Sequence, residues 1–423
     1  MSGDVRSTGP PARPGKSIGK AQPPDILFLG LLYDIDIEQK LIRDGRVGLQ
    51  AAPNQYQWGL ITGLTRIAEH IHVIASYPLG AFPVSGRKVL YPRRSVRSMP
   101  KLTLEYPTTL NIWVFRELIR AITMIRAVER NLRLGRDAVL IVYSLQLAFS
   151  LAVHALRRRH PTLRVIVVVP DIPGKYGVPR RWGSPRGVWE RLMGPLHSQM
   201  VRDADALVLL TDQMRDVLKV DGRPCVVVEG FSPEPKITGV SPRTAESKFI
   251  IAYTGTLELA FGLRDLFEAL ALLPADQYEL WVAGDGSARP YVKSQAAAHE
   301  NVKYVGFLDK AGVEELQSRS TVLVNPRPPE GAYTRYSFPS KTLAYLSAGR
   351  PVIMHRLDGI PREYEDYLFF IDENTPEALA QKIEDVCSLG NAELDAVGRA
   401  GQAWAASEKS PEAQARKVAS LWE

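Results

Sequence analysis

The chain has 423 residues, of which 45% are hydrophobic and 23% are charged, a composition typical of a globular protein with two domains of ordinary size. Two cysteines, Cys225 and Cys387, exclude a disulfide-rich scaffold and fit no zinc-binding spacing, so we expect a reducing, cytoplasmic setting. The absence of any run of about 18 apolar residues excludes a membrane-spanning helix.

The formal net charge of +7 is unevenly spread along the chain. Residues 1–240 hold 34 Lys or Arg against 20 Asp or Glu, a balance of +14, whereas residues 241–423 hold 19 against 26, a balance of −7. The two halves are therefore expected to meet different partners, and a basic half favours anionic lipid, phosphorylated acceptors or nucleic acid. No helix-turn-helix, zinc-finger or RNA-recognition signature occurs, so we expect no nucleic acid.

Residues 1–24 are rich in Gly, Pro, Ser and Lys, which predicts a disordered tail rather than a signal peptide. Apolar runs then predict five buried strands, at 25–30, 71–75, 138–143, 165–169 and 206–210. Helical patterns separate them at 56–69, 112–132 and 147–159, and Thr211 is placed to cap a helix over 212–219. This alternation indicates an α/β domain over residues 25–237, with a parallel sheet covered on both faces.

A stretch rich in Pro, Ser, Thr and Lys, residues 233–247, is expected to link two domains. The alternation then resumes over 238–400, with strands expected at 249–253, 278–283, 302–305, 321–324, 351–354 and 369–371 and helices at 263–273 and 376–386. The last residues, 401–423, are expected to form a helix that packs back on the first domain. The sequence thus predicts two tandem, doubly wound, Rossmann-like domains with a cleft between them.

Five loops of the second domain follow predicted strands and carry residues suited to binding a ligand. In doubly wound sheets, ligands bind at the carboxyl ends of the strands. The loops hold Gly255, Gly284–Gly286, Gly306, Asn325–Arg327 and Pro339–Lys341. Together they predict one converging site.

The segment from Tyr333 to Ile353 is the most informative of the five. Pro339 suits the first turn of a helix, where Ser340 and Lys341 follow, and Gly349 is placed to end that helix. Unpaired N–H groups and the helix dipole attract anions to such an end, and Lys341 adds a full positive charge. The segment predicts a phosphate site, although a helix with a surface lysine is the simpler interpretation.

The segments Tyr253–Thr256, Ala283–Gly286, Asn301–Phe307, Val324–Arg327 and Tyr336–Val352 occur in a distinctive order. In this order they resemble the retaining GT-B glycosyltransferases of group 1 (family 4-like), which include capsular, exopolysaccharide and lipopolysaccharide enzymes. Gly359–Pro361 with Glu363-Tyr364 looks like the polysaccharide-biosynthesis branch. The resemblance covers roughly residues 250–390, and the N-terminal half fits in architecture only.

The resemblance implies a nucleoside-diphosphate sugar as donor substrate, no cofactor and no metal. Lys341 and Ser340 would bind the diphosphate, Arg327 would assist, and Val305, Gly306 and Phe307 would line the base pocket. The remaining donor-side residues that it implies are Gly255, Thr256, Gly284, Asp285, Gly286, Tyr336, Ser337 and Phe338, the last three facing the sugar. Fixed cations and N–H groups would stabilise the charge on the leaving diphosphate.

The chain also departs from the family pattern. Many members carry two glutamates eight residues apart, and the second holds the ribose hydroxyls. This chain has Tyr336 and Ala344 at those places. Many members also carry a basic pair after the first strand of this half, where this chain has Thr256 and Phe261. Two Asp-x-Asp spacings, Asp34–Asp36 and Asp203–Asp205, lie in the other half and are not expected to bind metal.

On the acceptor side, Asp171 follows a predicted strand and is a candidate to accept a proton from an acceptor hydroxyl or to orient the sugar, but it is equally a candidate turn or cap residue. Asn54, Gln55 and Tyr56 sit where the family places an acceptor loop. Residues 87–133 and 175–191 mix basic and aromatic side chains, which favours peripheral contact with an anionic membrane on the inner face of the plasma membrane.

These observations predict a retaining glycosyltransferase that moves a sugar from a nucleotide-sugar donor to a glycan or lipid-pyrophosphate glycan acceptor in surface or exopolysaccharide synthesis. Tyr336 and Ala344 motivate an alternative, a non-catalytic nucleotide-sugar or glycan-binding protein on the same fold. Donor hydrolysis or transfer by the purified protein separates the two.

Overall fold

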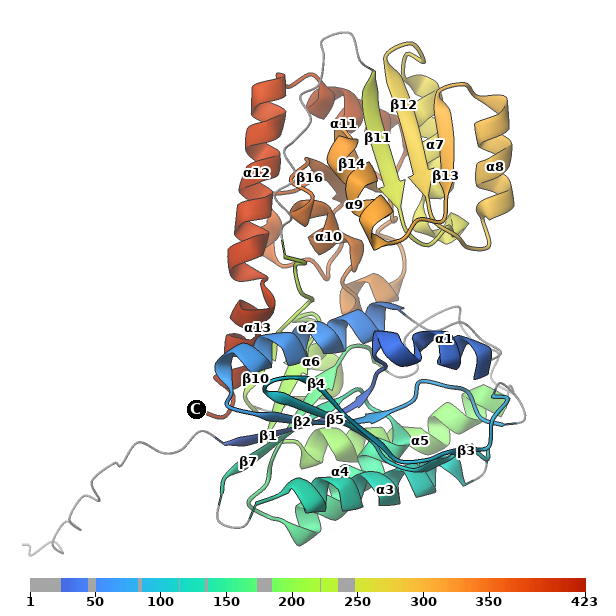
Figure 1. Ribbon diagram of the computed structural model, residues 1–423. Helices are drawn as coiled ribbons and strands as arrows, with labels where there is room; N and C mark the ends of the chain where they lie inside the picture. The colour runs from blue at the N-terminus through green and yellow to red at the C-terminus, as the bar shows by residue number, and fades with distance from the viewer. Residues whose placement is uncertain are drawn as a thin grey trace, which may run out of the picture.

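The computed structural model describes residues 24–44, 51–82, 86–113, 115–133, 136–172, 185–220, 222–234 and 248–423. They form two α/β domains stacked one above the other (Figure 1). The elements of the N-terminal domain are β1 (Asp25–Leu31), α1 (Ile35–Asp44), α2 (Ala51–Ile67), β2 (Ile71–Ser76), β3 (Leu90–Tyr91), β4 (Arg94–Met99), β5 (Leu102–Tyr106), β6 (Thr109–Leu110), α3 (Arg116–Asn131), β7 (Ala138–Tyr143), α4 (Leu147–Arg159), β8 (Arg164–Val169), α5 (Pro185–Asp203), β9 (Ala206–Leu209), α6 (Met214–Leu218) and β10 (Cys225–Val227).

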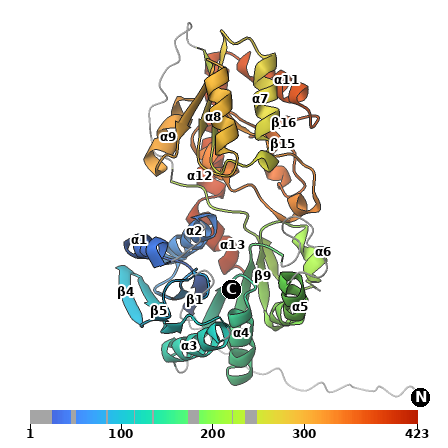
Figure 2. The ribbon, with the colours of Figure 1, turned by 90° about the vertical axis from the view of Figure 1, so that its right-hand side faces the viewer.

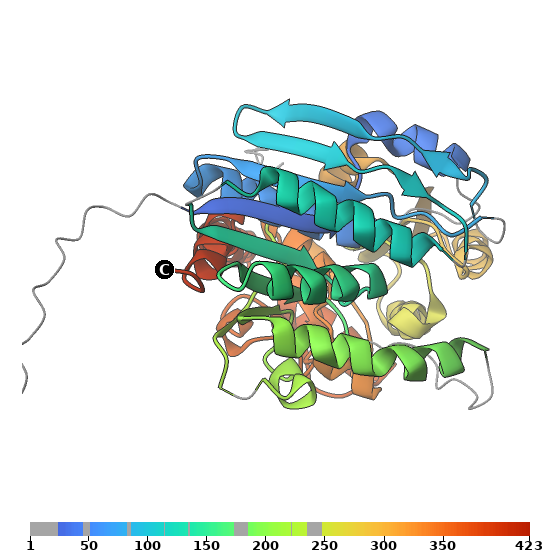
Figure 3. The ribbon, with the colours of Figure 1, turned by 90° about the horizontal axis from the view of Figure 1, so that it is seen from below.

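The first sheet has the strand order β10-β9-β8-β7-β1-β2-β5-β4, and only β4 pairs antiparallel. Successive side chains of a strand point to opposite faces, so each face of β1 packs against a separate core. Phe28 belongs to the core under α2, whereas Leu27 and Leu29 belong to the core under α3, α4 and α5. Figure 3 shows these three helices side by side on the face turned away from the C-terminal domain.

The C-terminal domain repeats this plan with a second parallel sheet, ordered β13-β12-β11-β14-β15-β16. Its elements are β11 (Phe249–Thr254), η1 (Leu259–Phe261), α7 (Leu263–Leu272), β12 (Tyr278–Ala283), α8 (Arg289–Ala298), β13 (Val302–Gly306), α9 (Lys310–Arg319), β14 (Val322–Asn325), η2 (Ala332–Tyr336), α10 (Lys341–Ser347), β15 (Val352–His355), η3 (Arg362–Tyr364), β16 (Phe369–Ile371), α11 (Pro376–Cys387), α12 (Asn391–Glu408) and α13 (Pro411–Ala419). β11 and β12 run toward the N-terminal domain, so their carboxyl ends lie between the two sheets (Figure 1).

Several elements differ from those predicted. The basic stretch after β2 forms strands β3 to β6, and α1, α5, α8, α9 and β10 were not predicted. Thr211 does not cap a helix, which begins at Met214. Its hydroxyl instead donates to the carbonyl of Arg335 in the other domain, 2.9 Å away. Most of the predicted linker lies outside the described residues, as do most of residues 175–191.

The chain crosses back to the N-terminal domain at its end. α12 lies along the C-terminal domain, and α13 packs against α2 of the other domain (Figure 2). Lys409 stands at the break between the two helices and is fully buried. A buried ammonium needs compensating charge, and the Lys409 Nζ contacts the carboxylates of Glu229 and Glu363.

This buried cluster joins three parts of the chain. Glu229 follows β10, Glu363 and Tyr364 belong to the C-terminal domain, and Lys409 begins the return to the N-terminal domain. The Tyr364 hydroxyl donates to Glu229 at 2.7 Å, and the Tyr364 and Trp404 rings lie 5.0 and 5.2 Å from the ammonium. Burial and the Glu229 charge raise the pKa of Tyr364 well above its usual value. The Glu363-Tyr364 pair noted in the sequence therefore contributes to the contact between the two domains.

Candidate active site

Glycines with positive φ shape the loops after β11, β12 and β13. The φ angles are +127° at Gly255, +144° at Gly284, +159° at Gly286 and +91° at Gly306, a region that residues with a Cβ rarely occupy. The loops are bonded to one another: the Gly255 amide donates to Ala283 O at 2.9 Å, and the Gly284 amide donates to Gly306 O at 2.8 Å. Neighbouring loops therefore hold each other in one arrangement.

Close packing also explains why glycine stands at two of these positions. A Cβ on Gly284 would lie 1.8 Å from the Gly255 carbonyl oxygen, so the backbones could not approach as they do. A Cβ on Gly255 would lie 2.4 Å from Lys341 Cε. Because Gly255 carries no side chain, the loop after β11 leaves room for the Lys341 side chain beside the strand ends.

Two buried tyrosines fix the backbone at the end of β11, beside the Lys341 side chain. The Tyr345 hydroxyl accepts a bond from the Thr254 amide at 2.9 Å and donates to the Thr254 carbonyl at 3.1 Å. The Tyr253 hydroxyl donates to Thr256 O at 2.7 Å. The sequence prediction missed Tyr345, which is one residue from Ala344 and points from α10 to the end of β11.

Lys341 lies at the centre of this arrangement. Its Nζ is 3.7 Å from the centroid of the Tyr253 ring, a cation–π contact. Burial, and then the charge of Arg327, lower the pKa of Lys341 from its usual 10.5 to about 7. The protein thus holds a desolvated amine beside a second cation, an arrangement that a bound anion would stabilise.

Arg327 comes from the loop after β14 and is held on two sides. Its guanidinium lies 5.7 Å from the centroid of the Phe261 ring, and its Nη2 donates to the Ser337 hydroxyl at 3.3 Å. Phe261 occupies a position where the related family often has a basic residue. Here the Phe261 ring contacts Arg327, so the positive charge beside Lys341 comes from the loop after β14.

The other predicted donor-side residues divide into exposed and engaged groups. Val305 and Phe307 are 45% and 79% exposed, on either side of Gly306 at the end of β13. Thr256 and Ser340 are exposed. Asp285 accepts a bond from the Gly286 amide at 2.9 Å and pairs with Arg289 at 3.4 Å, so its carboxylate serves its own loop.

The loop before α10 differs from the predicted arrangement. The helix begins at Lys341, so Pro339 and Ser340 precede it, and it spans only seven residues. Phe338 is 6% exposed and packs in the domain core against Tyr364, so its ring faces inward rather than toward a sugar. Ser337 is also buried, and Tyr336 packs against the N-terminal domain. A candidate anion site here would accordingly depend on side-chain cations and glycine loops.

The predicted acceptor residues of α2 are engaged in structural contacts. Asn54 exchanges two bonds with the backbone of Tyr33, at 3.0 and 3.2 Å, and Tyr56 donates to Val228 O at 2.8 Å. Gln55 is exposed. Gln57, fully buried, bonds both backbone groups of Leu31 and thereby fixes the loop after β1.

Asp171 lies just beyond the end of β8 and is exposed at the surface. Protein atoms around its carboxyl still desolvate it enough to raise its pKa. The negative charge of Asp171 in turn contributes, after burial, to raising the pKa of Tyr143 at the end of β7. The Tyr143 ring lies tilted beside that of Tyr56, with ring centroids 5.6 Å apart, so these three residues from separate elements lie close together.

Both Asp-x-Asp spacings serve the fold. Asp34 accepts a bond from the Ile37 amide at 3.0 Å, and Asp205 accepts one from the Val165 amide at 2.8 Å. Asp203 pairs with His154 at 3.0 Å. Among the residues that the structure describes, no group of three His, Cys, Asp or Glu side chains is arranged to hold a metal ion. Transfer without a metal stays a prediction.

Comparison with protein-family models matches residues 248–389, the segment that carries the glycine loops and Lys341, to one described as "Glycosyl transferases group 1". The C-terminal domain is a group 1 glycosyltransferase domain. The resemblance to group 1 glycosyltransferases is therefore confirmed, and with it the enzyme class, a glycosyltransferase. Retention of configuration and the polysaccharide-biosynthesis branch stay predictions. No curated protein matches the chain.

Solved structures confirm the GT-B fold over nearly the whole chain. Sucrose-phosphate synthase from Thermosynechococcus elongatus superposes with a TM-score of 0.64 at 15% identity, covering 94% of this chain and 98% of that one. Anabaena Alr3699/HepE in complex with UDP gives 0.60 at 15% identity, with 94% and 98% covered. An Escherichia coli trehalose-6-phosphate structure bound with UDP-2-fluoro glucose gives 0.62 at 11% identity, with 94% and 99% covered.

Proposed function

We propose that this group 1 glycosyltransferase takes its sugar from a nucleoside-diphosphate donor and that Lys341 and Arg327 bind the diphosphate. The observation that carries the proposal is the pair of cations held close together at the glycine loops, one of them with its pKa lowered by burial and by the other. A pyrophosphate placed against them supplies the compensating charge. The UDP complex of HepE and the UDP-2-fluoro glucose complex of the E. coli structure support a nucleotide donor.

In this proposal the fixed cations stabilise the charge that develops on the leaving diphosphate when the anomeric C–O bond breaks. The exposed Phe307 and Val305 offer an apolar surface for the base at the end of β13. The transfer retains the anomeric configuration without a protein nucleophile, because the leaving diphosphate helps to deprotonate the acceptor on the same face. Asp171 then orients the acceptor or accepts its proton, which suits a carboxyl whose pKa is raised.

We propose a glycan acceptor, free or carried on a lipid pyrophosphate at the inner face of the plasma membrane, in surface or exopolysaccharide synthesis. The basic N-terminal half supports an acceptor that carries phosphate. Within the described residues, no helix is long and apolar enough to cross a bilayer. We propose that contact with the membrane is peripheral.

One observation favours a second candidate, a non-catalytic nucleotide-sugar binding protein. Ala344, one helical turn from the cation site, carries no group that accepts a hydrogen bond from ribose hydroxyls. A binding protein could tolerate this loss better than an enzyme that must hold the donor in one orientation.

A thermal-shift screen of uridine, guanosine, adenosine, cytidine and thymidine diphosphates and their sugars tests the proposal. A ligand that binds only the folded protein raises the melting temperature. We expect at least one diphosphate to stabilise the wild type and not Lys341→Ala, and its sugar to be hydrolysed or transferred. Binding without turnover would favour the second candidate, and no shift with any nucleotide would contradict both.

A further inference from the structure

An apolar surface projects from the N-terminal domain at the start of α3. Five large apolar side chains are exposed there, namely Ile112 (36%), Trp113 (68%), Phe115 (55%), Leu118 (55%) and Ile122 (39%). Phe115, Leu118 and Ile122 follow the spacing i, i+3, i+7, so they lie on one side of the helix. We define these five residues as the α3 apolar surface. Single exposed apolar residues need no explanation, but a contiguous group of this size marks an interaction site.

The backbone beneath this surface is firmly held. The Trp113 amide donates to Phe82 O at 3.2 Å, and the Phe82 amide donates to Asn111 O at 2.9 Å. The Arg116 amide bonds Ile112 O at 2.8 Å, which closes the first turn of the helix. The described residues of this segment thus present their apolar side chains to solvent from a hydrogen-bonded backbone.

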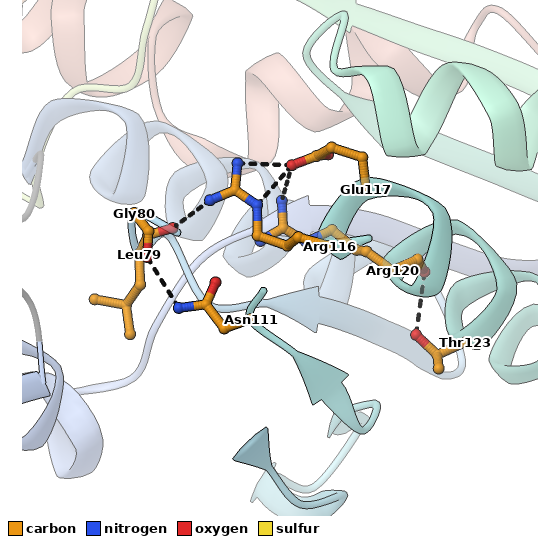
Figure 4. A network of polar contacts seen from close by, with 7 residues as sticks. All are labelled: Leu79, Gly80, Asn111, Arg116, Glu117, Arg120 and Thr123. Carbon is orange, nitrogen blue, oxygen red and sulfur yellow. Dashed lines mark hydrogen bonds and ion pairs between the residues drawn. The ribbon is translucent and has the colours of Figure 1, made fainter. Parts of the chain in front are cut away.

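A polar network anchors the same segment from the inside (Figure 4). The Arg116 guanidinium donates to Glu117 at 2.8 Å and to Leu79 O at 3.3 Å, and the Asn111 amide group donates to Gly80 O at 2.9 Å. Arg120, 4% exposed, also points to Glu117, and burial lowers its pKa to about 10. This network explains how Arg116 and Arg120 can turn inward at the start of α3, where Phe115 and Leu118 turn outward.

The part of the chain that carries the α3 apolar surface has an excess of positive charge. Residues 86–133 contain eleven Lys or Arg and three Glu, and each of these Glu residues is paired with arginine. Arg87 and Arg126 are exposed, and the Lys88 carbonyl accepts a bond from Asn111 at the edge of the surface. Exposed apolar side chains in a basic part of the chain complement an anionic lipid surface, which takes up the apolar groups and attracts the cations.

We infer that the α3 apolar surface docks this protein on an anionic membrane, with Trp113, Phe115 and Leu118 inserted among the lipid headgroups. A second copy of the chain fits less well, because a symmetric contact would bring two basic surfaces together. The surface adjoins the segment after β2, so it lies at the end of the sheet where the parallel strands finish and where Asp171 also lies. A membrane-bound acceptor would therefore meet the protein on the side of the proposed acceptor residues.

Sedimentation with vesicles tests this inference without any nucleotide, so its failure is distinct from failure of the transfer reaction. Full-length protein is mixed with vesicles of phosphatidylglycerol and phosphatidylcholine, or of phosphatidylcholine alone, at low and high salt. We expect binding to the anionic vesicles at low salt and weaker binding at high salt. The variant W113S/F115S/L118S should bind about tenfold or more weakly, whereas Leu272→Ser, an equally exposed residue of the other domain (56%), should bind as the wild type does.

Two further measurements test whether the triple variant is folded and whether the surface instead binds a second copy of the chain. Circular dichroism and the melting temperature should be unchanged in the triple variant, because the residues replaced are exposed. Size-exclusion chromatography should show the same oligomeric state for both proteins. Equal vesicle binding by the wild type and a correctly folded triple variant would overturn the inference. So would a wild-type dimer that binds no vesicles and that the triple variant converts to a monomer.

Discussion

The two domains share one plan but use their strand ends differently. In the C-terminal domain, glycines at the ends of β11, β12 and β13 let the loops pack closely and leave room for the Lys341 side chain beside the strands. In the N-terminal domain, the loop after β1 is fixed by Asn54 and Gln57, whose side chains are used up in backbone bonds. The strand ends of the C-terminal domain therefore carry cations, whereas the side chains named at the strand ends of the N-terminal domain mainly hold a loop in place. This difference is consistent with the proposal that the C-terminal domain binds the donor diphosphate.

The buried junction between the domains should give the largest effect on stability. Lys409→Ala leaves Glu229 buried without its counter-charge, and we expect it to lower the free energy of unfolding by about 3–5 kcal/mol. Denaturant titration followed by fluorescence measures the change. Lys310→Ala, which removes a surface lysine in a 3.9 Å helix pair, should change stability by less than about 0.5 kcal/mol. A Lys409 variant as stable as the Lys310 variant would show that the junction does not depend on this charge.

Catalysis should depend most strongly on the cation at the glycine loops. Lys341→Ala is expected to slow the release of nucleoside diphosphate from the donor, because the transition state loses roughly 2–4 kcal/mol of stabilisation. Lys310→Ala again serves as the control, since its side chain is 79% exposed on the same domain. A rate within twofold of the wild type in Lys341→Ala would remove this residue from the reaction.

The shape of the loops should matter nearly as much as their charge. Gly284→Ala places a Cβ 1.8 Å from the Gly255 carbonyl and forces an alanine to φ +144°, so we expect a loss of stability of about 1–3 kcal/mol and weaker nucleotide binding. Gly390→Ala is the matched control, because nothing lies within 4 Å of its Cβ and its φ is −63°. Melting temperatures of the two variants, with and without nucleotide, make the comparison. Equal behaviour would mean that the close approach of the loops is unimportant.

The lowered pKa of Lys341 predicts a smaller, pH-dependent effect. A bound diphosphate favours the charged amine and raises its pKa above the value of about 7 in the free protein, so binding takes up a proton. Affinity should be highest below pH 7 and fall on the order of tenfold as the pH rises to about 8.5. Lys341→Arg, which stays charged, should show a flatter profile. Identical profiles for the two proteins would place the pKa of Lys341 outside this range.

Most of the fold could be predicted from sequence because apolar runs and helical spacing report burial directly. The strands β1, β7, β12 and β16 were predicted within one residue of their ends. The short strands β3 and β6 and the basic strand β4 carry little of this signal, and β5 and the helices α1, α5, α8 and α9 were also missed. The residues that join the domains were missed as well, because the contact of Lys409 with Glu229 spans 180 positions.

The candidate site was only partly predictable for similar reasons. The glycines and Lys341 follow strands, so local sequence marks them as loop residues at the correct edge. The role of Phe261 in supporting Arg327, and that of Tyr345 in fixing Thr254, depend on contacts between separate loops. Phe338 was assigned to the sugar because of its place in the motif, but its ring is needed in the domain core.

Calorimetric titration of a nucleoside diphosphate into the wild type and into Lys341→Met at pH 7 tests the central claim most directly. The variant keeps the length and apolar stem of the side chain and removes only its charge. We predict that the wild type binds at least one of the diphosphates of uridine, guanosine, adenosine, cytidine or thymidine, and that the variant binds it about tenfold or more weakly. Equal affinity in the two proteins, or no binding of any of these nucleotides by the wild type, would contradict a diphosphate site at Lys341.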